Sequence, residues 1–239
     1  KQDSIERAKK NAAREAVKLV EDGFVIGLGS GSTAAYAIER IGERVRSEGL
    51  HVSGVPTSYQ AFMLAVKRHI PITTLEEHPT LDLTIDGADQ IDDKLNLIKG
   101  MGGALAREKI VAAASRKLII VADENKKVKT LGEGGQPVPT EVLPFSVPPA
   151  LRKMQEMEGN PVLREAKGKV GPVITDNGNV IVDVNFGLVH DPSELNLRLK
   201  LIPGVVETGL FINMATTVFL GSPSTVRKID RKSCKIFRS

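Results

Sequence analysis

Two aspartates three residues apart, Asp86 and Asp89, follow an apolar run that is typical of a buried strand. Carboxylates at the end of such a strand are partly removed from water and can exchange protons with sugar hydroxyls. Two other interpretations stay open from these residues alone. Asp92 and Asp93 are close enough in sequence to join a metal site, although no histidine accompanies them. Alternatively, Asp86 caps the turn by accepting hydrogen bonds from nearby backbone amides.

A second candidate pair is Lys99, which precedes a glycine-rich segment, and Glu108, about one turn into a predicted helix. If both side chains face one pocket, the glutamate can abstract a proton and the lysine can stabilise developing oxyanion charge. Arg107 and Lys109 flank Glu108, however, and such a charged run is more often a solvent-facing helix surface. The residues alone favour that second interpretation.

The segment 29–33, Gly-Ser-Gly-Ser-Thr, joins a predicted strand to a predicted helix. It offers unobstructed backbone N–H groups, hydroxyls and the positive end of a helix dipole, which together suit a phosphate group. The segment lacks the lysine of a Walker loop and departs from the G-x-G-x-x-G spacing, so it gives little support for a nucleotide. The alternative is a glycine-rich turn that only lets strand and helix pack closely.

These residues need elements that bring them together, and the first half of the chain supplies alternating strands and helices. The alternation predicts an α/β fold with a mostly parallel sheet, whose ligands bind beyond the carboxyl ends of the strands. The predicted strands are 24–28, 51–55, 81–85 and 117–122, and the predicted helices are 5–20, 35–45, 59–68 and 103–115.

From about residue 130 the chain becomes rich in glycine and proline, which indicates a boundary followed by turns. The pattern beyond it predicts a smaller α+β unit and a return to strands. The predicted elements are strand 141–147, helix 150–158, strands near Val162 and Val173, a turn at 176–179, strand 180–184, helix 192–201, strand-like segments 205–213 and 217–220, and a last helix at 223–228.

The chain has 239 residues and a formal charge of +4, so a polyanionic partner has to be considered. Six basic residues and one acidic residue lie in the segment 227–239, which leaves the rest of the chain nearly neutral. Seven Phe, two Tyr and no Trp provide few rings for stacking on bases. We therefore expect a solvated basic tail and no nucleic-acid partner.

Four histidines without metal-ligand spacing and a single cysteine give no sign of a metal site. No apolar run approaches the ~20 residues of a membrane helix, and the charged N-terminal segment lacks the apolar core of a signal peptide. We expect a cytoplasmic protein with no membrane partner.

Seven segments that cover nearly the whole chain carry a family resemblance. They are GLGSGSTAAYAIERIG (27–42), PTS (56–58), TIDGADQID (84–92), KGMGGALAREKI (99–110), VADENKKV (121–128), TDNGNVIVDV (175–184) and IPGVVETGLF (202–211). In this order they resemble the ribose-5-phosphate isomerase family of the A type.

The resemblance implies a Rossmann-like parallel-sheet domain formed by 1–129 plus 206–239, with an inserted α+β ferredoxin-like domain at 130–205. It implies the interconversion of D-ribose 5-phosphate and D-ribulose 5-phosphate through an enediol(ate), with no metal and no organic cofactor. A homodimer or homotetramer is the implied assembly.

Matched motif to motif, the catalytic base of the family falls on Glu108. Lys99 takes the role of oxyanion stabiliser, while Asp86 and Asp89 help to open the sugar ring and carry hydroxyl protons. The implied substrate-binding residues are Ser30, Gly31, Ser32, Thr33, Gly87, Ala88, Gly100, Met101, Gly102, Lys126 and Lys9.

Three residues depart from the usual family pattern: Ser30 replaces a threonine, Gln90 a glutamate and Met101 a glycine. Other functions also remain in view. One is another sugar-phosphate enzyme, such as an amino-sugar-phosphate deaminase or a phosphogluconolactonase, for which a well-placed catalytic histidine is lacking. Another is a non-catalytic sugar-phosphate sensor, which need not retain both Glu108 and Lys99.

Overall fold

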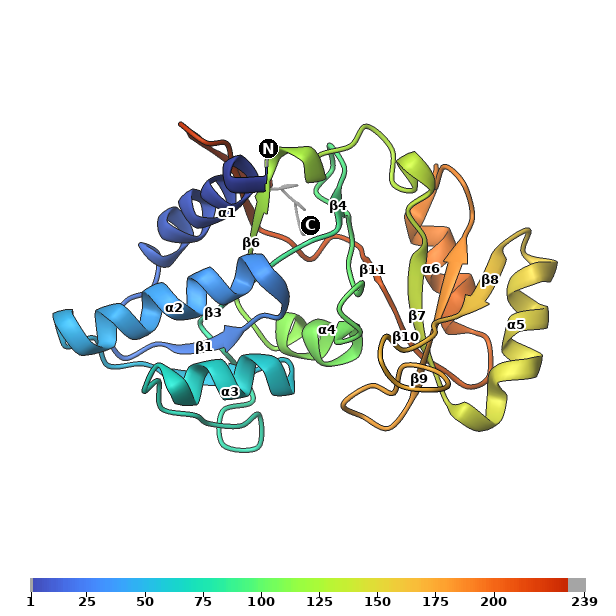
Figure 1. Cartoon of the computed structure of the whole chain (residues 1–239), viewed down its shortest axis with the longest axis horizontal. Coiled ribbons are helices and arrows are strands. Elements are labelled where there is room, and N and C mark those ends of the chain that lie inside the picture. The colour runs from blue at the N-terminus through green and yellow to red at the C-terminus, as the bar shows by residue number, and fades with distance from the viewer. Residues whose placement is uncertain (1, 232–239) are drawn as a thin grey trace, which may run out of the picture.

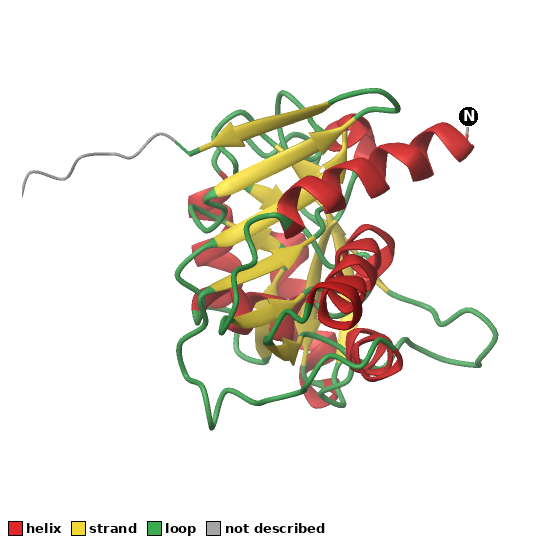
Figure 2. Cartoon of the chain, turned by 90° about the vertical axis from the view of Figure 1, so that its left-hand side faces the viewer, coloured by secondary structure: helices red, strands yellow, loops and turns green. Residues whose placement is uncertain are grey.

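The computed structural model describes residues 2–231. Its larger sheet has six strands in the order β13-β12-β6-β3-β1-β2, which Figure 2 shows one above another. All neighbouring strands run parallel except β13, which pairs antiparallel with β12. The mostly parallel α/β sheet predicted from the sequence is therefore confirmed. The strands are β1 (Val25–Leu28), β2 (Ser53–Pro56), β3 (Leu83–Asp86), β6 (Leu118–Asp123), β12 (Thr217–Gly221) and β13 (Val226–Asp230).

Both faces of the larger sheet are buried, because its strands direct alternate apolar residues into two cores. In β6, Ile119 and Val121 join the core under the first three helices, whereas Leu118, Ile120 and Ala122 join the core on the opposite face. No helix within 2–231 is long and apolar enough to cross a membrane. The helices around this sheet are α1 (Gln2–Val17), α2 (Gly31–Glu48), α3 (Tyr59–Lys67) and α4 (Leu105–Ala113).

An antiparallel sheet forms a second lobe, on the right of Figure 1. Its strand order is β10-β7-β9-β8, and its β-α-β-β-α-β chain order is that of ferredoxin-like domains. The sheet packs on two helices around a core of its own, to which β9 contributes Val180, Val182 and Val184. The elements are β7 (Val138–Val142), α5 (Val147–Glu156), β8 (Asn160–Leu163), β9 (Val180–Asn185), α6 (Pro192–Lys200) and β10 (Val205–Thr208).

A three-stranded sheet in the order β11-β5-β4 links the two lobes. Its strands are β4 (Gln90–Ile91), β5 (Leu97–Ile98) and β11 (Leu210–Phe211). Leu97 packs into a core of the larger sheet and Ile98 into the core of the second lobe. The next residue is Lys99, so this sheet places the lysine at the junction of the two lobes.

Three predictions for the second half need correction in their bounds or type. The strand predicted at 141–147 ends at Val142, and a short 3₁₀ turn, Pro144–Ser146, follows it. Residues near Val173 form isolated bridges rather than a strand. The segment 205–213 divides into two strands that belong to different sheets, because Gly209 lies tightly against Lys99 and Pro139 between them.

The helix predicted at 223–228 is wrong, because β13 occupies Val226–Asp230. This strand pairs along its whole length with the free edge of β12. Pairing of backbone groups along an open sheet edge outweighs the local helical signal. The first residues of the predicted basic tail thus belong to an edge strand, and 232–239 lie outside the described residues.

Candidate active site

A cavity of about 550 Å³ opens where the carboxyl ends of β1, β3 and β6 meet. Asp86 is fully buried behind the cavity wall, and Met101 does not line the cavity. The other predicted site residues come together around it. They are Lys9, Ser30, Gly31, Ser32, Thr33, Gly87, Ala88, Asp89, Lys99, Gly100, Gly102, Glu108 and Lys126.

One end of the cavity is the N-terminus of α2. Ser30 caps this helix with an extended backbone, and its hydroxyl lies 2.8 Å from that of Thr57 and 2.5 Å from that of Ser58. The following residues, Gly31 to Thr33, present the first turn of the helix to the cavity. The Gly31 N–H donates to Gln60 Oε1 at 2.9 Å. The next N–H groups of the first turn, which have no partner inside the helix, and the positive end of the helix dipole make this end suitable for an anion.

Two lysines add positive charge near this helix end. Lys9 Nζ lies 3.1 Å from the Ser32 hydroxyl and 3.0 Å from Glu6, which holds the lysine toward the cavity. Lys126 lies in a 3₁₀ turn directly after β6, where Asp123 caps the turn by accepting the Asn125 N–H. Both lysines line the cavity, so its charge matches a phosphate group.

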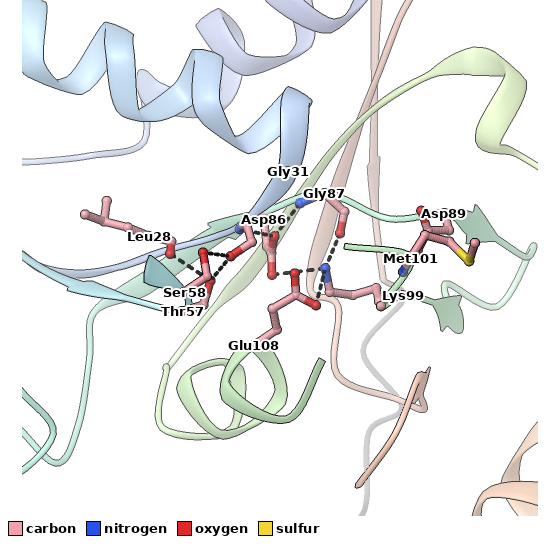
Figure 3. Close-up of polar contacts among 12 residues, drawn as sticks. Leu28, Gly31, Thr57, Ser58, Asp86, Gly87, Asp89, Lys99, Met101 and Glu108 are labelled. Atoms are coloured by element: carbon pink, nitrogen blue, oxygen red, sulfur yellow. Dashed lines mark hydrogen bonds and ion pairs between the residues drawn. The ribbon is translucent and has the colours of Figure 1, made fainter. Parts of the chain in front are cut away.

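The centre of the site is a buried lysine between two buried carboxyl groups (Figure 3). Lys99 Nζ lies 3.0 Å from Asp86 Oδ2 and 3.3 Å from Glu108 Oε2, and it donates to the Gly87 carbonyl at 2.6 Å. The Gly87 carbonyl thus accepts a hydrogen bond from the ammonium group, while Asp86 Oδ2 and Glu108 Oε2 form ion pairs with it and have no hydrogen-bond partner of their own. The lysine is thereby fixed at the cavity wall with little freedom to move.

Local structure explains why these side chains meet. Asp86 ends β3, and its Oδ1 accepts the backbone N–H groups of Gly87 at 2.7 Å and Ser30 at 3.1 Å. A side chain at Gly29 would bring its Cβ within 2.3 Å of the same oxygen, so only glycine allows the strand ends to approach. Glu108 lies in the first turn of α4 and is buried, so the solvent-facing interpretation is wrong for this residue.

Burial controls the protonation of the cluster. Burial and repulsion from Asp86 raise the pKa of Glu108 to about 8, against the attraction of Lys99. Burial also raises the pKa of Asp86, which Lys99 opposes. Burial by itself lowers the pKa of Lys99, but the two carboxylates outweigh it and raise this pKa above its ordinary value. The lysine therefore stays charged while a carboxyl group can gain and lose a proton near neutral pH.

Asp89 occupies the same cavity on the side of the segment that follows Lys99. Its Oδ2 accepts the backbone N–H of Met101 at 3.1 Å. Gly100 has φ +103°, and a Cβ there would lie 2.7 Å from Leu105, so glycine is required at this bend. The Met101 side chain projects to the exposed side, with its sulfur 3.9 Å from Arg164.

The departure at Gln90 has a local structural role. Its amide donates to the Glu133 carbonyl at 2.8 Å and accepts the Gly132 N–H at 2.7 Å. A carboxylate could accept the second bond but could not donate the first. The amide therefore ties β4 to the start of the second lobe and lies outside the charged cluster.

The residues that suggested a metal site take other partners. Asp92 accepts the backbone N–H groups of Lys94 and Asn96, both at 2.8 Å, and Asp93 pairs with Lys127. Within residues 2–231 no three His, Cys, Asp or Glu side chains are arranged to hold a metal ion.

Sequence reasoning missed the contribution of the second lobe to the cavity. The segment from Val173 to Asp176 lines the cavity together with Ser58 and Gln60, which lie at the N-terminus of α3. The Asp-Asn-Gly turn was a visible signal, but only the fold shows that the turn crosses to the other lobe.

A buried glutamate in β7 holds this segment. Glu141 Oε1 accepts hydrogen bonds from Thr175 at 3.0 Å, Asn177 at 2.9 Å and Asn179 at 2.7 Å. Arg107, the neighbour of Glu108 on α4, donates to Asn177 at 2.7 Å. The turn is thus fixed from both lobes.

These features define a class of protein: an α/β fold in which one cavity combines an anion-binding helix end with a buried lysine–carboxylate cluster. The family model described as ribose 5-phosphate isomerase A (phosphoriboisomerase A) matches residues 53–225. The chain belongs to this family.

Individual relatives are similar over nearly the full chain. Ribose-5-phosphate isomerase A of Methanosarcina acetivorans is 51% identical, with 94% of each chain covered. Human ribose-5-phosphate isomerase is 48% identical, covering 90% of this chain and 70% of the human protein.

Two solved structures have the same fold. Ribose 5-phosphate isomerase A of Methanocaldococcus jannaschii has a TM-score of 0.90 and 46% identity, covering 93% of this chain and 98% of that chain. A D-ribose-5-phosphate isomerase in complex with phospho-erythronic acid has a TM-score of 0.92 and 43% identity, covering 95% and 99%.

Proposed function

We propose that the chain interconverts D-ribose 5-phosphate and D-ribulose 5-phosphate through an enediol(ate) intermediate. The observation that carries the proposal is the buried cluster in which Lys99 Nζ lies 3.0 Å from Asp86 and 3.3 Å from Glu108 beside the cavity. A carboxyl group with a pKa of about 8 suits proton transfer to and from carbon near neutral pH. Membership of the isomerase family supports the same reaction.

In the proposed reaction, Glu108 removes the proton from C2 of the open-chain aldehyde. The electron pair of that C–H bond forms the C1–C2 double bond, and negative charge develops on O1, where Lys99 stabilises it. Transfer of the hydroxyl proton from O2 to O1, and return of the carbon proton from Glu108 to C1, gives the ketone. The sugar neither gains nor loses electrons overall, so the reaction needs no redox cofactor, and we propose that it needs no metal.

The remaining residues bind the sugar phosphate and open its ring. Asp86 and Asp89 carry hydroxyl protons, and the helix end at Ser30 to Thr33 binds the phosphate together with Lys9 and Lys126. Fixing the phosphate away from the reacting carbons uses binding energy to hold the sugar in a reactive orientation. The backbone of Gly87, Ala88, Gly100 and Gly102 completes the binding surface.

We also propose the division of the chain into a catalytic domain, 1–129 plus 206–239, and an inserted domain, 130–205. The separate apolar core of the antiparallel lobe supports this division, and β10 continues to Thr208, just beyond the boundary. A homodimer or homotetramer, a cytoplasmic location and the absence of nucleic-acid and membrane partners complete the proposal.

The direct test is Glu108→Gln, which keeps the shape of the side chain but removes the base. We expect kcat for ribose 5-phosphate to fall by about 10²–10⁴-fold, with a much smaller change in KM. Glu156→Gln on the surface of α5 is the matched control and should leave kcat unchanged. Turnover of Glu108→Gln close to that of the unmodified protein would show that the base is elsewhere.

Two further assays separate the alternative functions. Ribose 5-phosphate that binds without being converted would favour a sensor, and turnover of other sugar phosphates in a substrate panel would favour a related enzyme. Activity that vanishes with EDTA and returns with a divalent ion would contradict metal independence.

A further inference from the structure

Arg164 reaches from the second lobe to the segment that follows the buried lysine. It comes directly after β8, and its guanidinium forms a two-point ion pair with Asp183 of β9, with Nε 2.7 Å from Oδ2. Its Nη1 donates to the carbonyl oxygens of Gly100 and Met101, both at 3.0 Å. The arginine side chain is only 13% exposed, and its bond to the Gly100 carbonyl is partly buried, whereas its bond to the Met101 carbonyl is exposed.

The Gly100–Met101 peptide bond connects this arginine to Asp89. The carbonyl oxygen of this peptide accepts from Arg164, while its N–H, on Met101, donates to Asp89 Oδ2 at 3.1 Å. A cation on the carbonyl and a carboxylate on the N–H polarise one peptide in the same direction, which strengthens both hydrogen bonds. The orientation of Asp89 therefore depends on a residue of the other lobe.

The local backbone has few restraints of its own. Gly100 has φ +103°, and because glycine lacks a Cβ, many other backbone conformations are open to it. Met101 is 45% exposed, so packing of its side chain adds little to hold the peptide. The Gly100 carbonyl also accepts the Gly103 N–H at 2.9 Å within the turn, and the bonds from Arg164 add a connection from this turn to the second lobe.

We propose that Arg164 is a positioning residue for Asp89, acting through the Gly100–Met101 peptide. The proposal rests on the proposed function, in which Asp89 carries a proton during opening of the sugar ring. Loss of Arg164 should slow conversion of the cyclic substrate. It should disturb much less the binding of an open-chain acid such as phospho-erythronic acid, which has no sugar ring to open.

The test compares Arg164→Gln with Arg152→Gln, a control that removes an exposed arginine from α5. For Arg164→Gln we expect kcat for ribose 5-phosphate to fall by about ten- to a hundredfold, because small displacements of a reacting group are costly. Calorimetric binding of phospho-erythronic acid should weaken by about threefold or less, and the control should leave both values unchanged. Equal losses in turnover and analogue binding, or unchanged turnover, would overturn the proposal.

Two further variants test whether Arg164 influences kcat through Asp89. Arg164→Lys keeps the charge but cannot bind Asp183 and both carbonyls together, so it should recover only part of the activity. In a protein that already carries Asp89→Ala, Arg164→Gln should lower kcat little further, because the effects of substitutions within one hydrogen-bond network are not additive. Full recovery by lysine or fully additive losses would contradict positioning through Asp89. Absence of isomerase activity in the unmodified protein would instead refute the proposed function.

Discussion

The molecule contains two clusters of buried carboxyl groups. The carboxyl groups of the first cluster interact with a cation, and that of the second accepts hydrogen bonds from neutral groups. Asp86 and Glu108 share a buried cation, Lys99, beside the cavity. Glu141, in the second lobe, has one oxygen that accepts from Thr175, Asn177 and Asn179. All three donors of the Glu141 cluster are neutral, and they belong to a single turn.

The first cluster contains a group that can change protonation, and the second holds a turn in place. In the first cluster burial raises the pKa of Glu108 to about 8, so the protonated and ionised forms are both accessible near neutral pH. In the second, several short hydrogen bonds fix a turn that supports the cavity wall. Substitutions in the first cluster should therefore change turnover most, and substitutions in the second should mainly change stability.

The largest combined effect on turnover and stability is expected for Lys99→Met. Removal of the cation takes away the oxyanion stabiliser, so kcat should fall by about 10²–10³-fold or more. The two buried carboxyl groups are left unpaired, which should lower the free energy of unfolding by about 3–5 kcal/mol at pH 8. Denaturant melts at pH 5 and pH 8 check this, and the loss should be smaller at pH 5, well below the pKa of about 8 of Glu108, which is then protonated and uncharged. Equal losses at both pH values would contradict this account.

Glu141→Ala should lower the stability of the protein much more than its kcat. The buried donors Thr175 and Asn179 and the exposed Asn177 lose their acceptor, and the side chain leaves a cavity, so the free energy of unfolding should fall by about 2–4 kcal/mol. The effect on kcat should be well below that of Lys99→Met. Thr140→Ser, at a neighbouring buried position of the same strand, serves as the control. A kcat loss as large as that of Lys99→Met would show that Glu141 belongs to the reacting groups.

A smaller effect concerns how stability depends on pH. The pKa of Glu108 is raised in the folded protein, so its contribution to stability is complete below about pH 4.5 and is lost as the pH rises through about 8. In Glu108→Gln this group no longer titrates, and the decline in stability between pH 5 and pH 8 should become shallower. Urea melts across this range measure the slope. A slope that is unchanged by the substitution would mean that the pKa of Glu108 is not raised.

The smallest effect is expected for a surface pair. Glu156 bonds to Arg152 and Lys153 on the exposed face of α5, and exposed pairs of this kind add little to stability. Glu156→Ala should therefore shift the urea midpoint only slightly and leave kcat unchanged. A large loss of stability or of kcat would show that removal of any charge, and not of a buried one in particular, explains the difference between the clusters.

Much of the fold was predictable because the signals were long or chemically distinct. Continuous apolar runs indicated the buried strands of the larger sheet, and glycines marked the turn at 29–33. The two-residue strands β4 and β5 carry too little pattern to be recognised. β13 was predicted as a helix because its strand structure depends on pairing with β12, which is a tertiary interaction.

The candidate site was predictable where motif and strand end coincide. Asp86, Lys99 and Glu108 were identified from motifs of the isomerase family, although the charged run around Glu108 alone favoured a surface helix. Arg164 and Glu141 were not identified, because each acts through partners that are distant in sequence and meet only when the second lobe packs against the larger sheet.

The most direct test of the central claim is the dependence of kcat/KM for ribose 5-phosphate on pH. Measurements should start at pH 7, above the second ionisation of a phosphate ester at roughly pH 6. Glu108 must be ionised to act as a base, so kcat/KM should rise with pH to a plateau, with an apparent pKa of about 8. A profile that is flat from pH 7 to pH 9 would contradict a buried base with a raised pKa.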